Sequence, residues 1–557
     1  MTAEDVQHSN DIGGEQTRWT IAIWGSVIAV GALLSVVLWP FWSEFRLRGD
    51  DFALVLNSSW PYVSASDVAR WFTEGYTNYF NNYPDWPSQG YGFVRPVMNL
   101  AFFVQSFLVP AVGEAAYLIL NYVALLVSVA LLVAAIRRYS NARPLVAAVA
   151  AIAVGVSPVW HDALFLPSMG TNVLALAFCI AALVVLDPRR GVPAGVRMVS
   201  CVALLVMAVL SHETAAVMPI VCAALLVGMS PTRPRAAQLL PLAVPIALVL
   251  AFRVVQSFGS LYVAPQLNSA EVVPRIKYFL LGPLFPTGWV TADLVGGFTT
   301  SFEAIAFWLG LLVNVVAVAL LIWLARHRPA VRAIALICAV LVACVPGVLM
   351  SGQARFMGLS VVVATVVIAY VASAAPSLRN LFFAVLLVSQ VAWFVAGVNV
   401  GGEYHTAMVR QAGQFYDVSQ TAIRDNQPET VVLVNDRTGF GGARAMLTLA
   451  AWPKRDAELV VLNSFTGPAD PRAYVDVVRD GSQLRFESVF GPRQLFYFWG
   501  ANPILSKPVA GFTFTDVVTN PDGFGGGFRA QGDKGPGAVL VLGIDPSSNR
   551  ILLPEMY

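Results

Sequence analysis

The sequence predicts an α-helical polytopic membrane protein with a soluble α/β domain at its C-terminal end. Of its 557 residues, 57% are hydrophobic and only 12% are charged, against about 25% charged in an ordinary soluble domain. Apolar stretches recur through residues 20–398, and a membrane span needs about 20 such residues. From about residue 399 the pattern changes to short alternating runs between glycine, proline and aspartate turns. That pattern is typical of strands.

The apolar stretches predict eleven spans between residues 20 and 398. They lie near 20–40, 116–136, 144–157, 171–187, 197–211, 213–229, 236–253, 303–324, 332–350, 357–373 and 381–398. A further apolar stretch at 95–110 is expected to be a re-entrant or interfacial helix, or part of the second span. The first span is followed by no small-residue cleavage site, so we expect a retained helix and not a signal peptide.

Arginines in the short loops predict the orientation of these spans. Arginine-rich loops, from Arg137 and Arg138 through Arg379, alternate with short loops in which Arg355 is the only basic residue. Arginine-rich loops are cytoplasmic by the positive-inside rule. We therefore expect a multi-pass protein of a bacterial inner (plasma) membrane. The expected parts are a cytoplasmic tail at 1–19, a membrane domain at 20–398, external loops at 41–95 and 254–302, and an extracytoplasmic domain at 399–557.

The C-terminal domain is expected to contain strands and at least one helix. Its alternating runs are 429–435, 457–463, 482–489 and 537–544, and the helix is expected near 442–451. The segment TGFGGARAML opens that helix. A glycine cluster there can bind phosphate at a helix N-terminus, but a tight strand–helix turn is the favoured interpretation.

Composition also excludes some functions. A net charge of +2 does not indicate a nucleic-acid partner. The five cysteines all fall within apolar stretches and show no metal-ligand spacing, so neither a metal site nor a disulfide framework is predicted from them.

The polar residues that stand out in the sequence fall on the predicted external side. Asp50 and Asp51 follow the first span, Arg95 precedes the second, and Arg355 lies between the ninth and tenth. Two further pairs lie in external loops: His161 with Asp162, and His212 with Glu213. Charged groups near a bilayer are costly unless they are paired or used, so we expect these residues to share one cavity.

Four segments carry a resemblance to a known family. They are DDFALVLNSSW, FVRPVMNLAFFVQSFLVP, SPVWHDALFLPSMGTNVLALAF and LLVMAVLSHETAAVMPIVCAALL, in that order within residues 20–230. Together they resemble the GT-C superfamily of polytopic glycosyltransferases, especially the protein O-mannosyltransferase branch. In that family an acidic pair follows the first span, and a Ser-Lys-Glu turn stands where this chain has His212 between Ser211 and Glu213.

The resemblance implies an inverting glycosyltransferase that takes a sugar from a polyprenyl-phosphate-linked donor. It implies Asp50 as the general base and Asp51 as a supporting acid or hydrogen-bond partner. Residue chemistry agrees, because an acceptor hydroxyl needs a base and a departing phosphate needs a cation. Arg355 and Arg95 are the expected phosphate ligands. His161, Asp162, His212 and Glu213 are expected to contact substrate.

Several alternatives stay open at this point. The acidic pair can instead form ion pairs with Arg46 and Arg48, and Arg95 can extend to the membrane interface. A transporter or flippase of a lipid-linked substrate is the rival function, and an assembly scaffold is a third. The acceptor is expected to be an envelope glycan or lipid. No metal ligands are predicted, although the family includes metal-dependent enzymes and the requirement stays open.

Overall fold

The computed structural model describes most of the helical region and part of the tail. The described residues are 3–47, 50–64, 68, 71–72, 95–186, 192–229, 234, 239–257, 301–327, 329–349, 357–374, 376–434, 446, 449–450, 458–461, 475–480, 483–488, 512–519, 526–532, 539–544 and 551–556.

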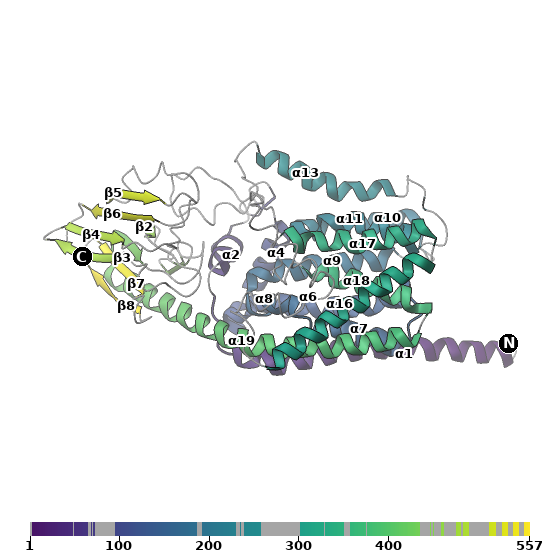
Figure 1. Cartoon of the computed structure of the whole chain (residues 1–557). Coiled ribbons are helices and arrows are strands. Elements are labelled where there is room, and N and C mark those ends of the chain that lie inside the picture. The colour runs from purple at the N-terminus through teal and green to yellow at the C-terminus, as the bar shows by residue number, and fades with distance from the viewer. Residues whose placement is uncertain are drawn as a thin grey trace.

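Each predicted apolar stretch coincides with a helix, and these helices form one bundle with α13 along its outside (Figure 1). The helices are α1 (Ala3–Trp42), α6 (Ala116–Tyr139), α7 (Pro144–Gly155), α9 (Gly170–Leu186), α10 (Ala194–Ser211), α11 (Met218–Met229), α13 (Ala243–Ser257), α16 (Ser301–His327), α17 (Ala330–Leu349), α18 (Gly358–Val371) and α19 (Pro376–Asn426). Within the described residues, six helical segments are long and apolar enough to cross a membrane, and five further apolar helices are shorter. A mostly helical protein with several helices long and apolar enough to span a membrane is thus confirmed, while eleven crossings stay a prediction.

The sequence of α1 shows why one helix face points inward and the other outward. Its buried residues Val30, Leu34 and Leu38 recur every four positions, and the exposed face includes Trp24 and Trp39. Since neighbours at this spacing share a face of a helix, α1 packs one apolar stripe against the bundle and presents another to lipid.

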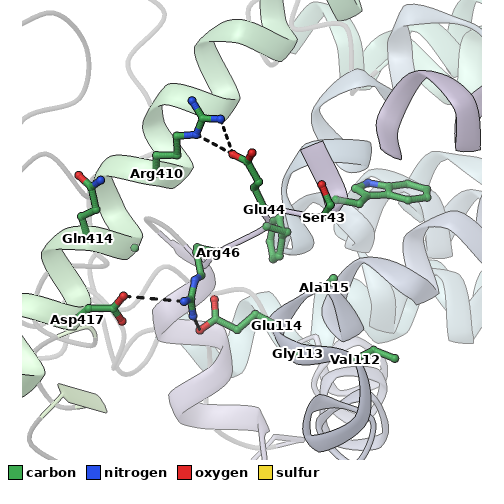
Figure 2. A pocket seen from close by; sticks show the side chains of 13 residues that line it. Ser43, Glu44, Arg46, Val112, Gly113, Glu114, Ala115, Arg410, Gln414 and Asp417 are labelled. Carbon is green, nitrogen blue, oxygen red and sulfur yellow. Dashed lines mark hydrogen bonds and ion pairs between the residues drawn. The ribbon is translucent and has the colours of Figure 1, made fainter. Parts of the chain in front are cut away.

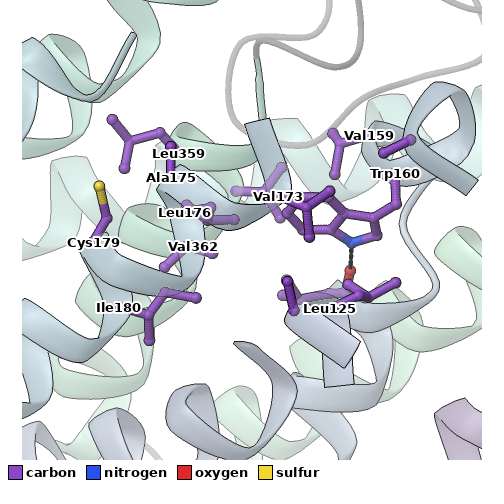
Figure 3. Packing of buried hydrophobic residues seen from close by; sticks show 14 of the residues in the cluster. Leu125, Val159, Trp160, Val173, Ala175, Leu176, Cys179, Ile180, Leu359 and Val362 are labelled. Carbon is purple, nitrogen blue, oxygen red and sulfur yellow. Dashed lines mark hydrogen bonds between the residues drawn. The ribbon is translucent and has the colours of Figure 1, made fainter. Parts of the chain in front are cut away.

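Helix α18 occupies the centre of the bundle. Every one of its residues except Tyr370 is buried, as expected of a helix that is hydrophobic on all sides. Figure 3 shows the packing beside it, where Leu359 and Val362 lie near Leu176. The Trp160 indole N–H in the same cluster donates to the Val154 carbonyl at 2.6 Å, so a large aromatic is buried with its polar atom satisfied.

Short helices occupy the end of the bundle that faces the strands. They are α2 (Asp50–Ser58), α4 (Pro96–Ser106), α5 (Val109–Val112), η2 (Gly113–Ala115), η3 (Pro158–Trp160), α8 (His161–Phe165), η4 (Pro167–Met169) and η5 (Glu213–Val217). The 95–110 stretch forms α4 and α5, with Val104 and Phe107 more than half exposed. Two short 3₁₀ turns, η6 (Leu240–Leu242) and η8 (Ala372–Ala374), lie elsewhere in the bundle.

The described part of the tail contains two four-stranded sheets. Its strands are β1 (Thr430–Val434), β2 (Glu458–Val461), β3 (Val475–Asp480), β4 (Gln483–Ser488), β5 (Phe512–Thr519), β6 (Gly526–Gly532), β7 (Val539–Ile544) and β8 (Ile551–Met556). One sheet has the order β2-β1-β7-β8, with β1 parallel to β2 and β7. The other, β3-β4-β6-β5, is antiparallel. All four predicted runs coincide with strands, whereas the TGFGGARAML turn lies outside the described residues apart from Met446.

Helix α19 joins the bundle to the strands without a break. The sequence predicts a span ending at 398, but the helix continues to Asn426 and contacts β7 and β8. Beyond the bundle, Val409, Ala412, Phe415 and Ser419 are buried and recur at helical spacing. The chain termini therefore lie at opposite ends of the molecule, with α2 and α8 on the side of the strands (Figure 1).

Candidate functional site

The acidic pair opens helix α2, which begins at Asp50. Carboxylates in the first turn interact favourably with the helix dipole. The Asp51 side chain is fully buried, and its Oδ1 accepts a hydrogen bond from the Ser168 backbone N–H at 2.9 Å. Ser168 belongs to η4, so Asp51 connects α2 to the segment that also contains His161 and Asp162.

Helix α2 is held on three further sides. Ser58 donates to Asn99 Oδ1 of α4 at 3.0 Å, and the Tyr117 hydroxyl of α6 donates to Ser59 Oγ at 2.9 Å. On α19, Tyr416 stacks against Phe52 with ring centroids 5.7 Å apart. The corner of the chain that contains the acidic pair is therefore fixed by both the bundle and α19.

A second polar cluster joins Arg95 to His212 and Glu213, which lie in a different predicted external loop. Arg95, at the N-cap of α4, donates to Glu213 through Nη2 to Oε1 at 2.8 Å and through Nε to Oε2 at 3.1 Å. The two side chains are 14% and 26% exposed. A two-pronged guanidinium–carboxylate contact of this kind is both strong and directional.

The surroundings of His212 define its tautomer. Its Nδ1 accepts the Thr214 backbone N–H at 3.2 Å and also lies 2.8 Å from the Thr214 hydroxyl. A ring nitrogen that accepts an amide hydrogen carries no proton, so the neutral ring holds its hydrogen on Nε2. That atom faces Glu213 Oε1 at 3.6 Å and Arg95 Nη2 at 3.3 Å. The His212 ring therefore packs against both members of the Arg95–Glu213 pair.

Asn121 of α6 forms hydrogen bonds to the segment that joins α8 to α9. Its side-chain amide donates to the carbonyls of Ala163 at 2.8 Å and Leu166 at 3.3 Å. A Cβ built on Gly170 would lie 1.8 Å from Asn121 Oδ1, so only glycine allows this close approach.

The remaining sequence-predicted residues are described in part or not at all. Arg355 lies outside the described residues, and the side chains of Asp50 and His161 are likewise not described. Asp162 is half-buried. Among the described residues, no group of three or more His, Cys, Asp or Glu side chains is arranged to hold a metal ion.

A charged cavity of about 480 Å³ lies beside this site, between the end of α1, η2 and α19 (Figure 2). On one side, Arg410 Nη2 is 2.6 Å from Glu44 Oε2. On the other, Arg46 lies between two acids, with Nη1 3.8 Å from Glu114 Oε1 and Nη2 3.9 Å from Asp417 Oδ2.

From the sequence, Arg46 is expected only as an ion-pair partner of the acidic pair, and this cavity is not predicted. One signal was the spacing of Arg410, Gln414 and Asp417, which places three polar residues on one face of a helix continuing past 398.

Comparison with known proteins found a distant likeness to a solved structure. No family model matches this chain, and no curated protein matches it. The structure is similar to the crystal structure of ArnT from Cupriavidus metallidurans bound to undecaprenyl phosphate, with 14% sequence identity and a TM-score of 0.40. The likeness covers 78% of this chain and 86% of ArnT.

Proposed function

We propose that this protein is an inverting membrane glycosyltransferase of the GT-C type. It transfers a sugar from a polyprenyl-phosphate-linked donor to a glycan or lipid acceptor of the cell envelope, on the extracytoplasmic face. The observation that supports this most directly is the anchoring of the acidic pair, in which buried Asp51 fixes α2 to η4 at 2.9 Å. The Arg95–Glu213 pair lies at the N-cap of α4, a helix that contacts α2.

The reaction is a single displacement. Asp50 accepts the proton of an acceptor hydroxyl, and the acceptor oxygen attacks the anomeric carbon of the donor sugar. The bond between that carbon and the phosphate oxygen breaks, and polyprenyl phosphate leaves with the bonding electron pair. Attack opposite the leaving group inverts the anomeric centre.

The other residues position these groups. Asp51, buried and bonded to the Ser168 amide, acts as a positioning residue for α2. Arg355 is assigned to the departing phosphate, because a planar guanidinium matches phosphate oxygens. Arg95 is already engaged by Glu213 on two nitrogens, so its assigned role is to hold Glu213 and His212 at the edge of the site.

Replacing Asp50 tests the proposal. Asp50→Asn keeps the side-chain shape but cannot accept the proton, so turnover is expected to fall by roughly 10²–10⁴, measured with a panel of polyprenyl-phosphate sugars. Donor binding is expected to survive, because the phosphate is held elsewhere. Asp51→Asn is expected to reduce turnover less.

Two results would change the assignment. If Asp50→Asn is active and Asp51→Asn is inactive, the base is one residue further along the chain and the mechanism stands. If both variants are fully active, the glycosyltransferase proposal fails and a transporter of a lipid-linked substrate replaces it.

A further inference from the structure

We propose that the charged cavity between α1, η2 and α19 binds a neutral saccharide and is the subsite for the acceptor glycan. That the bound saccharide is the acceptor rests on the proposed function. That the cavity binds a neutral saccharide rests on the structure of the cavity alone. A volume of about 480 Å³ falls within the range of ligand sites, about 300–1,000 Å³.

The cavity contains hydrogen-bonding capacity that the described protein does not use. The Arg46 side chain is 50% exposed, and its ion-pair distances to Glu114 and Asp417 are 3.8 and 3.9 Å. Both exceed the length of a hydrogen bond. Its guanidinium therefore offers N–H donors to the cavity, with carboxylate acceptors beside them.

The spacing of these groups suits a hydroxyl. A polar contact longer than about 3.5 Å can be bridged by a small polar group that lies beside it. A hydroxyl accepts from a guanidinium N–H and donates to a carboxylate at the same time. A sugar presents several hydroxyls in a fixed arrangement, and it can bridge both gaps around Arg46.

The balance of charge favours a neutral ligand. Three acidic side chains, Glu44, Glu114 and Asp417, face two guanidinium groups, Arg46 and Arg410, and burial raises the pKa of the Glu114 carboxyl. The lining therefore carries no net positive charge that would attract a phosphate or other anion. A metal cation is also disfavoured, because Arg46 itself lies between Glu114 and Asp417 (Figure 2).

The location suits an acceptor. The Leu47 backbone N–H donates to Glu114 Oε2 at 2.7 Å, and Leu47 precedes Asp50 by three residues. A saccharide held against Glu114 and Arg46 is thus anchored to the chain segment that leads directly into the acidic pair.

Ligand binding can be measured without turnover, by saturation-transfer NMR on the full chain in lipid nanodiscs. The probes are neutral methyl pyranosides and furanosides of common hexoses and pentoses, and the competitor is inorganic phosphate. Arg46→Met removes the donors and breaks no hydrogen bond to a described residue. Gly413→Leu fills the cavity, because a Cβ there would lie 2.8 Å from Arg46 Cγ. Gly25→Leu, with nothing within 4 Å of its Cβ, is the matched control.

Binding of at least one methyl glycoside is expected, weakened about tenfold or more by Arg46→Met and Gly413→Leu and unchanged by Gly25→Leu and by phosphate. Three results would overturn the proposal: no binding of any glycoside, binding unchanged in both cavity variants, or displacement by phosphate. If glycoside binding holds while Asp50→Asn and Asp51→Asn are both fully active, the saccharide site stands and the proposed function fails.

Discussion

At the scale of single residues, the structure contains two Arg–Glu pairs of the same chemistry in different surroundings. Arg95 and Glu213 are largely buried, whereas Arg410 and Glu44 are 60% and 46% exposed. Water screens the exposed pair, which makes it worth about 0–1 kcal/mol. Loss of one partner from the buried pair leaves the other charge poorly solvated.

The two pairs allow a matched test. Arg95→Leu or Glu213→Leu is expected to lower the free energy of unfolding by about 1.5–3 kcal/mol, and the double variant is expected to lose less than the sum. The corresponding changes at Arg410 and Glu44 are expected to cost at most about 1 kcal/mol. Denaturant titration in detergent measures all six variants. If the substitutions lower the free energy of unfolding equally in both pairs, the Arg95–Glu213 pair is as accessible to water as the Arg410–Glu44 pair.

Gly170 gives a second residue-scale prediction. Gly170→Ala forces a methyl group against Asn121 Oδ1, and Asn121 cannot retreat without losing its bonds to the Ala163 and Leu166 carbonyls. We expect a loss of about 1–3 kcal/mol, the usual cost of overpacking, seen as a lower Tm. Gly195→Ala, where the added Cβ meets nothing within 4 Å, is expected to leave the Tm unchanged or higher. A Gly170→Ala protein of wild-type stability would contradict the close approach of Gly170 to the Asn121 side chain.

At the scale of elements, the contact between α2 and α19 links the acidic pair to the tail. Tyr416 stacks on Phe52, and burial raises the pKa of the Tyr416 phenol above its usual range. The phenol is therefore neutral at any working pH, and its contribution to this contact is packing.

Removing this stack is expected to affect turnover more than stability. Tyr416→Leu removes an aromatic pair worth about 0.5–1.5 kcal/mol and loosens α2, so turnover is expected to fall while the protein stays folded. Gln420→Ala, an exposed position one turn further along α19, is the control and is expected to be active. If the Tyr416→Leu variant turns over at the wild-type rate, the contact between α2 and α19 is not needed for activity.

The same element shows where prediction from the sequence succeeds and where it stops. Apolar runs are local signals, so each predicted stretch coincides with a helix. The continuation of α19 to Asn426 is polar on one face and produces no apolar run. Arg95, His212 and Glu213 were each selected for their position in external loops. A shared cavity was predicted for them, but the ion pair between Arg95 and Glu213 was not. The cavity around Arg46 was not predicted either, because packing brings together residues such as Glu114 and Asp417 that are far apart in the sequence.

At the scale of the whole molecule, the arginine pattern predicts which end of the bundle is cytoplasmic. Reporter fusions after residues 139 and 330 are expected to report a cytoplasmic location, and a fusion after residue 450 an external one. The structure places the N-terminus and the strands at opposite ends of the bundle (Figure 1). If the fusion after residue 450 reports a cytoplasmic location, the acidic pair lies on the inner face of the membrane. An acceptor on the extracytoplasmic face would then not meet it.

The unbroken course of α19 has a mechanical consequence. A helix from Pro376 to Asn426 is about 75 Å long at 1.5 Å per residue, and a bilayer core occupies about 30 Å of it. The rest of the helix extends beyond the bilayer core. It contacts β7 and β8, and Phe52 packs against it at Tyr416. Two adjacent glycines, Gly401 and Gly402, lie within the helix on the bundle side of Tyr416, and glycine pairs are among the places where helices bend. We therefore expect a bend of α19 at these glycines to shift Tyr416 and to change its contact with Phe52 of α2.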